Sequence, residues 1–168
     1  MWEHQALTRA RFCAGEAAAG AAFEEERRHI LGLERDAAHL AAEVRAMRKT
    51  MLEGHPNRSE LFDLKHDRGG MVDIEFLVQF LVLAHAHRHP ILARNDGNIA
   101  LLGYAAELGL IAGGLAAQVQ QAYRAYRRRQ HALRMEGARY ARVPREEVAE
   151  HVEATLALWK AVMGAADL

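Results

Sequence analysis

Apolar residues recur along most of this chain at the three- and four-residue steps of an α-helix. The clearest stripe lies before the middle of the chain and predicts one face of a helix; its members are Leu33, Ala37, Leu40, Val44, Met47 and Met51. The segment from Val72 to about His87 is apolar on nearly every side, which is typical of a central, buried helix. We therefore expect that segment to form the centre of the core.

Helix-forming residues and cap residues predict further elements around these two. Ala-rich sequence and a Glu–Arg run favour helices from Trp2 to about Phe12 and from Glu16 to Leu31. Asn95 and Asp96 are expected to cap a helix from about Gly97 to Leu108. These elements place helical structure over most of the N-terminal two thirds.

Two more helices are expected in the C-terminal third. Gly113 and Gly114 precede a long helix whose apolar residues include Leu115, Val119, Ala122, Tyr126 and Leu133. Pro144 suits the first turn of a last helix, with Val148, Val152, Leu156 and Trp159 facing inward. The helical period is lost over residues 57–70, where only Leu61–Lys65 resembles an extended segment. The pattern predicts an all-α fold: a bundle of about six to seven helices in one helical domain over residues 1–168.

Composition narrows the class of protein. With 168 residues of which 51% are hydrophobic, the chain is able to build a core, so disorder is not expected. Twenty-two basic residues balance twenty-two acidic ones, which gives no global attraction to nucleic acid or to an anionic membrane. The longest apolar stretch is too short to cross a bilayer. The single cysteine, Cys13, is expected to be buried and fits a reducing cytoplasm.

The segment Phe62–Phe76 carries the most informative chemistry. Two glycines before a helix, Gly69 and Gly70, allow a tight turn that aims N–H groups at an anion, and Lys65 and Arg68 add positive charge. The alternative is a purely structural turn. Asp73 is expected to meet the positive helix end, to pair with Lys65 or Arg68, or to point outward toward a metal–nucleotide complex.

Two segments together resemble one enzyme family. Trp2–Arg11, and Phe62–Phe76 followed by Gln79, are similar to segments of bacterial glutamine synthetase adenylyltransferase, and Asn98–Leu102 with Gly109-Leu110 fits its next helix. That family has two nucleotidyltransferase halves, each followed by helices: one half removes AMP from glutamine synthetase and the other attaches it. Asp63-Leu64-Lys65 and the Val72-Asp73 pair look more like the adenylyl-attaching half.

The resemblance implies a helical accessory or regulatory domain that does not itself catalyse. Nucleotidyltransferases of this superfamily need a Gly-Ser turn and an Asp-x-Asp pair to hold Mg²⁺, and this sequence has no Gly-Ser pair. We therefore expect a piece of a longer polypeptide whose catalytic domain lies upstream. The parent enzyme would use ATP and Mg²⁺. Its implied partners are the upstream domain and glutamine synthetase, with the PII signal protein and glutamine as further candidates; no metal ligands are assigned within this chain.

Candidate contact residues follow from that resemblance. Arg9, Arg11 and Glu75 are expected at the domain interface or near a nucleotide, although a solvated helix face explains the two arginines equally well. A single cleft facing the catalytic domain should then also contain the phosphate-side candidates, which are Lys65, Arg68, Gly69, Gly70 and Asp73.

Three other readings of the sequence stay open. Arg124, Arg127 and Arg128 lie on a basic helix that is a candidate partner surface in a pure interaction or effector-binding module. The i, i+4 pair His85 and His89 has the spacing of zinc ligands but lacks an evident third ligand. The related uridylyltransferases have a similar Lys and Gly-Gly segment, and membership of that family is the last-ranked of the hypotheses.

Overall fold

The computed structural model describes residues 2–164, which form helices and one small sheet. The α-helices are α1 (Trp2–Leu7), α2 (Ala17–Leu31), α3 (Ala37–Gly54), α4 (Met71–His85), α5 (Asn98–Glu107), α6 (Gly113–Met135) and α7 (Ala149–Met163). Two 3₁₀-helices, η1 (Pro90–Ala93) and η2 (Arg145–Val148), precede α5 and α7. The strands β1 (Phe62–Asp63) and β2 (Arg142–Val143) pair antiparallel. The all-α prediction is confirmed, as is the extended segment within residues 61–65.

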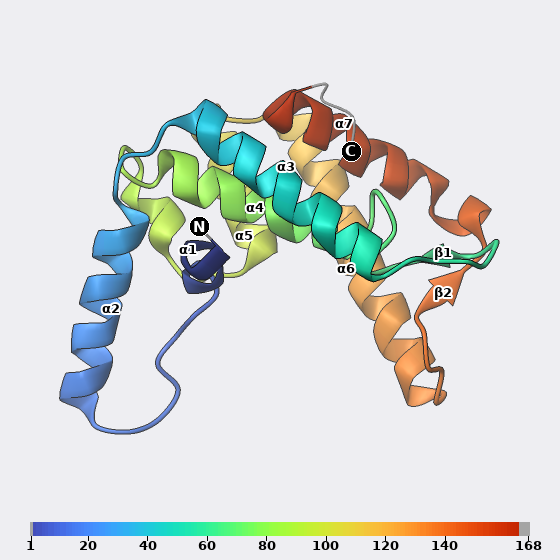
Figure 1. Cartoon of the computed structure of the whole chain (residues 1–168), viewed down its shortest axis with the longest axis horizontal. Helices are drawn as coiled ribbons and strands as arrows, with labels where there is room; N and C mark the ends of the chain where they lie inside the picture. The colour runs from blue at the N-terminus through green and yellow to red at the C-terminus, as the bar shows by residue number, and fades with distance from the viewer. Residues whose placement is uncertain (1, 165–168) are drawn as a thin grey trace.

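Helix α4 is the centre of the core, as its sequence predicts. It contacts α1, α3, α5, α6, α7 and η1, and these helices lie around it in Figure 1. Of its fifteen residues only Glu75, Gln79 and His85 are not fully buried. A helix that is apolar on every side is stable only when its neighbours cover every side, because each buried apolar side chain contributes about 1.5–3 kcal/mol.

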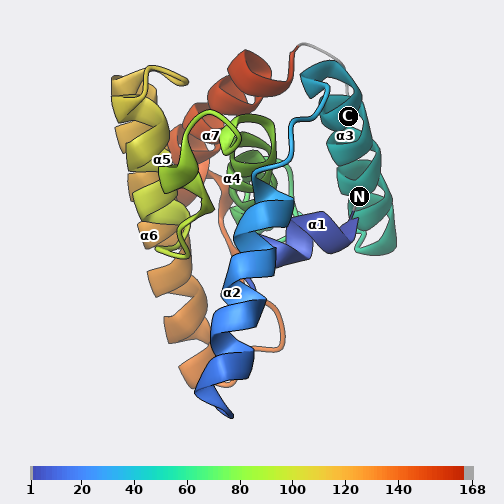
Figure 2. The ribbon, with the colours of Figure 1, turned by 90° about the vertical axis from the view of Figure 1, so that its left-hand side faces the viewer.

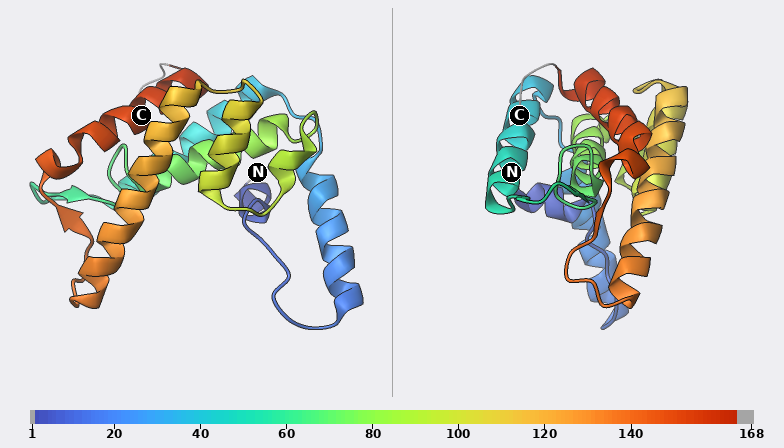
Figure 3. Two further views of the ribbon diagram at one scale, coloured as in Figure 1. Left: turned by 180° about the vertical axis from the view of Figure 1, so that it is seen from behind. Right: turned by 90° about the vertical axis from the view of Figure 1, so that its right-hand side faces the viewer.

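The helices form an arch (Figure 1), and in the end-on view α2 and α6 extend below the other helices (Figure 2). Helix α2 and the C-terminal half of α6 project downward at opposite ends, and α1 lies between them beneath α4. Seen from behind, α5 packs beside α6, and α7 runs back from the small sheet toward the top of the arch (Figure 3). The sheet joins the loop before α4 to the segment before α7, so the segments that lead into these two helices are hydrogen-bonded to each other.

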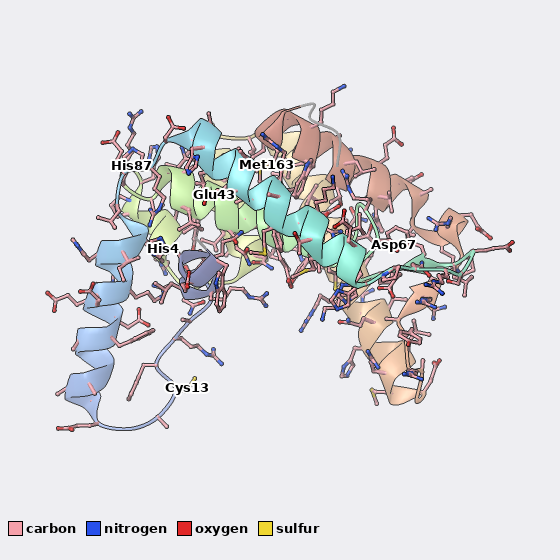
Figure 4. The ribbon with its side chains drawn as sticks, in the orientation of Figure 1. His4, Cys13, Glu43, Asp67, His87 and Met163 are labelled. Carbon is pink, nitrogen blue, oxygen red and sulfur yellow. The ribbon has the colours of Figure 1, made fainter. Side chains whose placement is uncertain are left out.

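The first helix is shorter than its sequence predicts. It ends at Leu7, where the chain continues in a turn with bonds three residues back, and the buried Arg27 side chain donates through Nε to the Leu7 carbonyl at 3.0 Å. The following segment is a loop, so the prediction that Cys13 is buried is wrong. Its thiol is exposed on that loop, well below the helical layer in Figure 4.

The start of α3 also departs from the predicted pattern. Helix α3 begins at Ala37 because the Asp36 side chain caps it by accepting the His39 N–H at 2.6 Å. Leu33 therefore lies outside the helix and is exposed.

Two predicted features of later helices are corrected as well. Helix α5 begins after Gly97 without a side-chain cap, so Asn95 and Asp96 do not cap it. In α7, Val152 and Leu156 are only half-buried, because the fully buried face carries Ala154, Thr155, Leu158 and Trp159 instead.

Candidate functional site

The Gly-Gly turn before α4 is packed against the protein interior. Gly69 has a positive φ of 84°, and a Cβ on it would lie 2.7 Å from the Val152 side chain of α7. A Cβ on Gly70 would meet the Asp67 carbonyl oxygen at 2.9 Å. The buried Tyr126 hydroxyl donates to the Gly69 carbonyl at 3.1 Å. Close packing and backbone conformation therefore require glycine here, whether or not the turn meets a ligand.

The N–H groups of this turn already have partners within the protein. Gly69 donates its N–H to the Asp73 carboxylate, and Gly70 donates to the Asp67 carbonyl at 2.9 Å. The first two N–H groups of α4 donate to carbonyls of the preceding loop. The expectation that the turn aims unpaired N–H groups at an anion is wrong, because the loop folds back and accepts those bonds itself.

Asp73 is fully buried between two arginines. Arg48 of α3, also fully buried, donates through Nε to the Asp73 carboxylate and through Nη2 to the His66 carbonyl at 2.7 Å. The Arg68 Nε lies 3.6 Å from the other carboxylate oxygen of Asp73. The prediction that Asp73 pairs with Arg68 is confirmed, whereas the prediction that Asp73 points outward is wrong. The carboxylate instead joins α3, the loop and α4.

The predicted phosphate-side residues do not converge. Lys65 lines a hollow beside β2, together with Arg142. Arg68 lines an apolar groove along α7, and its guanidinium lies 5.8 Å from the Trp159 ring centroid. Arg9 lines a third hollow. Within this chain these residues therefore line separate hollows, while a cleft that they share with a catalytic domain, and contact of Lys65 or Arg68 with a nucleotide, stay predictions.

A cleft of about 560 Å³ lies where the end of α1, the start of α5 and the middle of α6 meet. We call it the α1–α6 cleft; Arg9, Arg11, Asn98, Tyr123 and Arg127 are among its lining residues. It brings together two residues predicted for a domain interface, Arg9 and Arg11, and one predicted for a partner surface, Arg127. Arg127 lies more than 110 positions along the chain from Arg9 and Arg11, so only the fold brings it beside them.

Glu75 of α4 organises one side of the α1–α6 cleft. Its carboxylate lies 3.0 Å from the Arg9 guanidinium and accepts the Tyr123 hydroxyl at 3.1 Å. Burial raises the pKa of Tyr123, and the neighbouring negative charge of Glu75 raises it further. Tyr123 is therefore a neutral hydrogen-bond donor at pH 7, and the Glu75 charge is compensated by Arg9.

The remaining charges give the cleft a positive character. Asp96 is engaged by Arg94 at 2.9 Å and by the Tyr104 hydroxyl at 2.8 Å. Among residues 2–164, no carboxylate lies within ion-pair distance of Arg11 or Arg127. Two uncompensated guanidinium groups beside a neutral donor suit an acidic side chain or a phosphate.

The other candidate residues lie outside this cleft. Arg124 and Arg128 are exposed on α6. His85 and His89 lie at the end of α4 and in the turn after it, and burial lowers the pKa of His85. Within the described part of the chain, no three His, Cys, Asp or Glu side chains gather as metal ligands. No helix there has both the length and the apolar run that a membrane span requires.

Sequence reasoning missed the two buried arginines that organise the loops. Arg48 and Arg27 each stand in a helical run among other charged residues, a context typical of solvent-exposed positions. Arg27 also donates to the Ala93 carbonyl at 2.8 Å, which fixes η1 against α2. The apolar stripe of α3 held a weak signal, because Arg48 follows Leu40 and Val44 at helical spacing and so lies on their face.

Comparison with known proteins identifies the family. The family model described as GlnD PII-uridylyltransferase matches residues 37–161. A bifunctional glutamine synthetase adenylyltransferase/adenylyl-removing enzyme of Burkholderia mallei is 57% identical over 98% of the chain. Enzymes of the same name from Aromatoleum aromaticum and Nitrosomonas europaea are 56% and 47% identical over 99% and 98% of it.

The chain spans only about 18% of the length of the Burkholderia and Aromatoleum enzymes, so it corresponds to one segment of such proteins. The family model takes its name from a uridylyltransferase, whereas these individual relatives are adenylyltransferases. The match covers α3 to α7, including the Arg48–Asp73 pair and the Gly-Gly turn. The chain therefore belongs to the GlnD PII-uridylyltransferase family, and within it is similar to the segment found in bifunctional glutamine synthetase adenylyltransferase/adenylyl-removing enzymes.

Proposed function

We propose that this chain is the helical domain that adjoins the adenylyl-attaching catalytic domain of a glutamine synthetase adenylyltransferase. The observation that carries the proposal is the 57% identity over 98% of the chain to an enzyme of that name. In the parent enzyme, located in the cytoplasm, AMP would pass from Mg²⁺-bound ATP to glutamine synthetase. The helical domain would hold the catalytic domain in place and would not perform the transfer.

The α1–α6 cleft is the proposed docking side for the catalytic domain. Trp2 on α1 is 61% exposed, and Arg9 and Arg11 follow in the turn and loop after that helix. An exposed tryptophan, and an arginine such as Arg11 that has no carboxylate partner among residues 2–164, are typical of an interface core and its charged rim. Acidic side chains of the catalytic domain, or the phosphates of its nucleotide, would pair with Arg11 and Arg127.

A segment exchange tests this function directly. The corresponding segment of the Burkholderia enzyme is replaced by this chain, and both attachment of AMP to glutamine synthetase and its removal are measured. The Aromatoleum segment, 56% identical to this chain, is exchanged in parallel as the control. We expect both chimeras to attach AMP. An inactive chimera carrying this chain, beside an active Aromatoleum chimera, would contradict the proposal.

Single substitutions in the exchanged segment then test the docking side. Arg127→Gln removes one guanidinium from the cleft, whereas Arg128→Gln makes the same change at an exposed neighbour outside it. Loss of one charge-assisted hydrogen bond predicts about a tenfold slower AMP attachment for Arg127→Gln only. AMP removal, assigned to the other half, should stay unchanged. Equal effects of the two substitutions would remove the cleft from the interface.

A second candidate function is binding of an effector protein. Arg124 and Arg128 are exposed and lie four residues apart on α6, so they share one helix face. Charge reversal of both to Glu should abolish binding of the PII signal protein in a pull-down and leave basal AMP attachment intact. Undiminished PII binding would exclude this surface.

A further inference from the structure

We propose that the hollow between the small sheet and the end of α6 binds a phosphate-bearing small molecule. We call this hollow, of about 380 Å³, the sheet cleft; its side chains include His55, Lys65, His66, Arg134, Arg139 and Arg142. Its lining residues come from the segments around β1, β2 and the C-terminal half of α6, which lie side by side at one end of the arch (Figures 1 and 3). It shares no lining residue with the α1–α6 cleft.

The charge balance of the sheet cleft favours an anion. Four cationic side chains and a single carboxylate, that of Asp63, line it. The Asp63 carboxylate is already used: one oxygen accepts the N–H groups of Lys65 and His66 at 3.0 Å, and the other lies 3.5 Å from Arg142. Among residues 2–164, Lys65, Arg134 and Arg139 have no carboxylate within ion-pair distance, so the cleft is left with excess positive charge.

Neighbouring contacts hold the cations in place before any ligand arrives. Arg142 and Arg139 lie over the Tyr140 ring, 4.4 and 5.3 Å from its centroid. Arg134 donates to the carbonyls of Ala138 and Arg139 at 3.2 and 2.7 Å. Guanidinium groups fixed in this way lose less side-chain entropy on binding, and their planar N–H groups match phosphate oxygens.

A stacked histidine pair completes one wall. The rings of His55 and His66 lie 4.2 Å apart and are parallel within 3°, and the buried Nδ1 of His66 has no hydrogen-bond partner among the described residues. Burial lowers the pKa of His66; the nearby His55, Lys65 and Arg48 lower it further, and Asp63 opposes them. The unpaired cations suit an anion, and so does a neutral imidazole that is able to take up a proton. Binding of the anion should therefore strengthen as the pH falls.

The concave shape favours a small ligand over a nucleic acid. A nucleic-acid site needs cations along an extended groove or stripe, whereas these cations surround a hollow of the volume typical of small-molecule sites. The exposed arginines Arg124 and Arg128 of α6 do not line it. The ligand chemistry is therefore that of inorganic phosphate, pyrophosphate or the phosphate chain of a nucleotide.

The test is calorimetric titration of the 168-residue chain with inorganic pyrophosphate and separately with ATP, at pH 6 and pH 8. We expect saturable binding that is tighter at pH 6. Arg139→Gln and Lys65→Gln, both at exposed side chains, should each weaken it about tenfold, the effect of losing one charge-assisted hydrogen bond. If pyrophosphate and ATP bind with the same dependence on pH and on these two side chains, the phosphate chain is the group that the cleft recognises.

The matched control is Arg124→Gln, an equal charge change at an exposed arginine of α6 outside the cleft. It should leave both titrations unchanged. Absence of saturable binding, or an equal loss in Arg124→Gln and Arg139→Gln, would overturn the proposal, because the second result indicates diffuse charge attraction. Binding of a single-stranded oligonucleotide in preference to pyrophosphate would overturn it as well. The proposal for the sheet cleft does not depend on the assignment to an adenylyltransferase, so a failure of one would leave the other standing.

Discussion

Removal of the Arg48 side chain should be the most destabilising single change in the loop that precedes α4. Arg48 and Asp73 are both fully buried and paired, and Arg48 also donates to the His66 carbonyl. Arg48→Met keeps the aliphatic volume but leaves the Asp73 carboxylate buried without its closest cation. Breaking a buried ion pair in this way costs about 3–5 kcal/mol, because the desolvated charge that remains is uncompensated.

Urea unfolding followed by circular dichroism measures this cost. With an m-value of about 2 kcal/mol/M, Arg48→Met should lower the midpoint by about 1.5–2.5 M. Lys49→Met removes an exposed cation from the adjacent position and should change stability by less than about 0.5 kcal/mol. Arg48→Lys keeps the charge but loses the planar fork, so an intermediate midpoint is expected.

The double variant Arg48→Met/Asp73→Asn separates the ion pair from other contributions. The asparagine side chain that replaces Asp73 is neutral and can still accept the Gly69 N–H, so the double variant should be more stable than Arg48→Met alone by about 0.5–3 kcal/mol. Additive losses in the two single variants, or a loss below about 1 kcal/mol for Arg48→Met, would refute the claim that Asp73 depends on Arg48.

Three further predictions concern the turn and two titrating groups near the core. Gly69→Ala should lower stability by about 2–4 kcal/mol in thermal unfolding, since it adds φ strain and a clash with Val152; Gly109→Ala, with a positive φ but open space, should lose only about 1–2 kcal/mol. Burial raises the pKa of Tyr126, so stability should fall as the pH rises above about 10, where this tyrosine ionises first in the unfolded chain. Tyr126→Phe should lose about 1 kcal/mol of stability at pH 7 and show a weaker decline of stability at alkaline pH. Burial lowers the pKa of His85, so stability present above pH of about 6.5 should decline on acidification, and a decline that is unaltered in His85→Gln would assign it to other groups.

Local chemistry made much of the fold predictable. The segment from Val72 is apolar on all sides, and a helix of that kind has no stable position except the centre of the core. The glycines that end helices and the lost period before α4 marked the loops for the same local reason. The end of α1 was not predictable from neighbouring residues, because Arg27, twenty residues away, donates to the Leu7 carbonyl there.

The site divides in the same way. The sequence grouped Gly69, Gly70 and Asp73 as candidate phosphate contacts, and the structure joins two of them, Gly69 and Asp73, through a hydrogen bond. Their direction was decided by Arg48: with that cation buried behind the loop, Asp73 lies inward and not toward a ligand. The only sign in the sequence that Arg48 would be buried was a weak one, its helical spacing from Leu40 and Val44.

The sequence by itself determined which segments are helical, which helix is central, and which family the two motif-bearing segments resemble, because propensity, periodicity and local motifs act within a few residues. Only the tertiary structure decided that Arg9 and Arg127 share a cleft, and that Lys65 and Arg139 share another. Those groupings depend on how long helices cross. Crossing geometry is set by side-chain packing summed over the whole core, which no local pattern records.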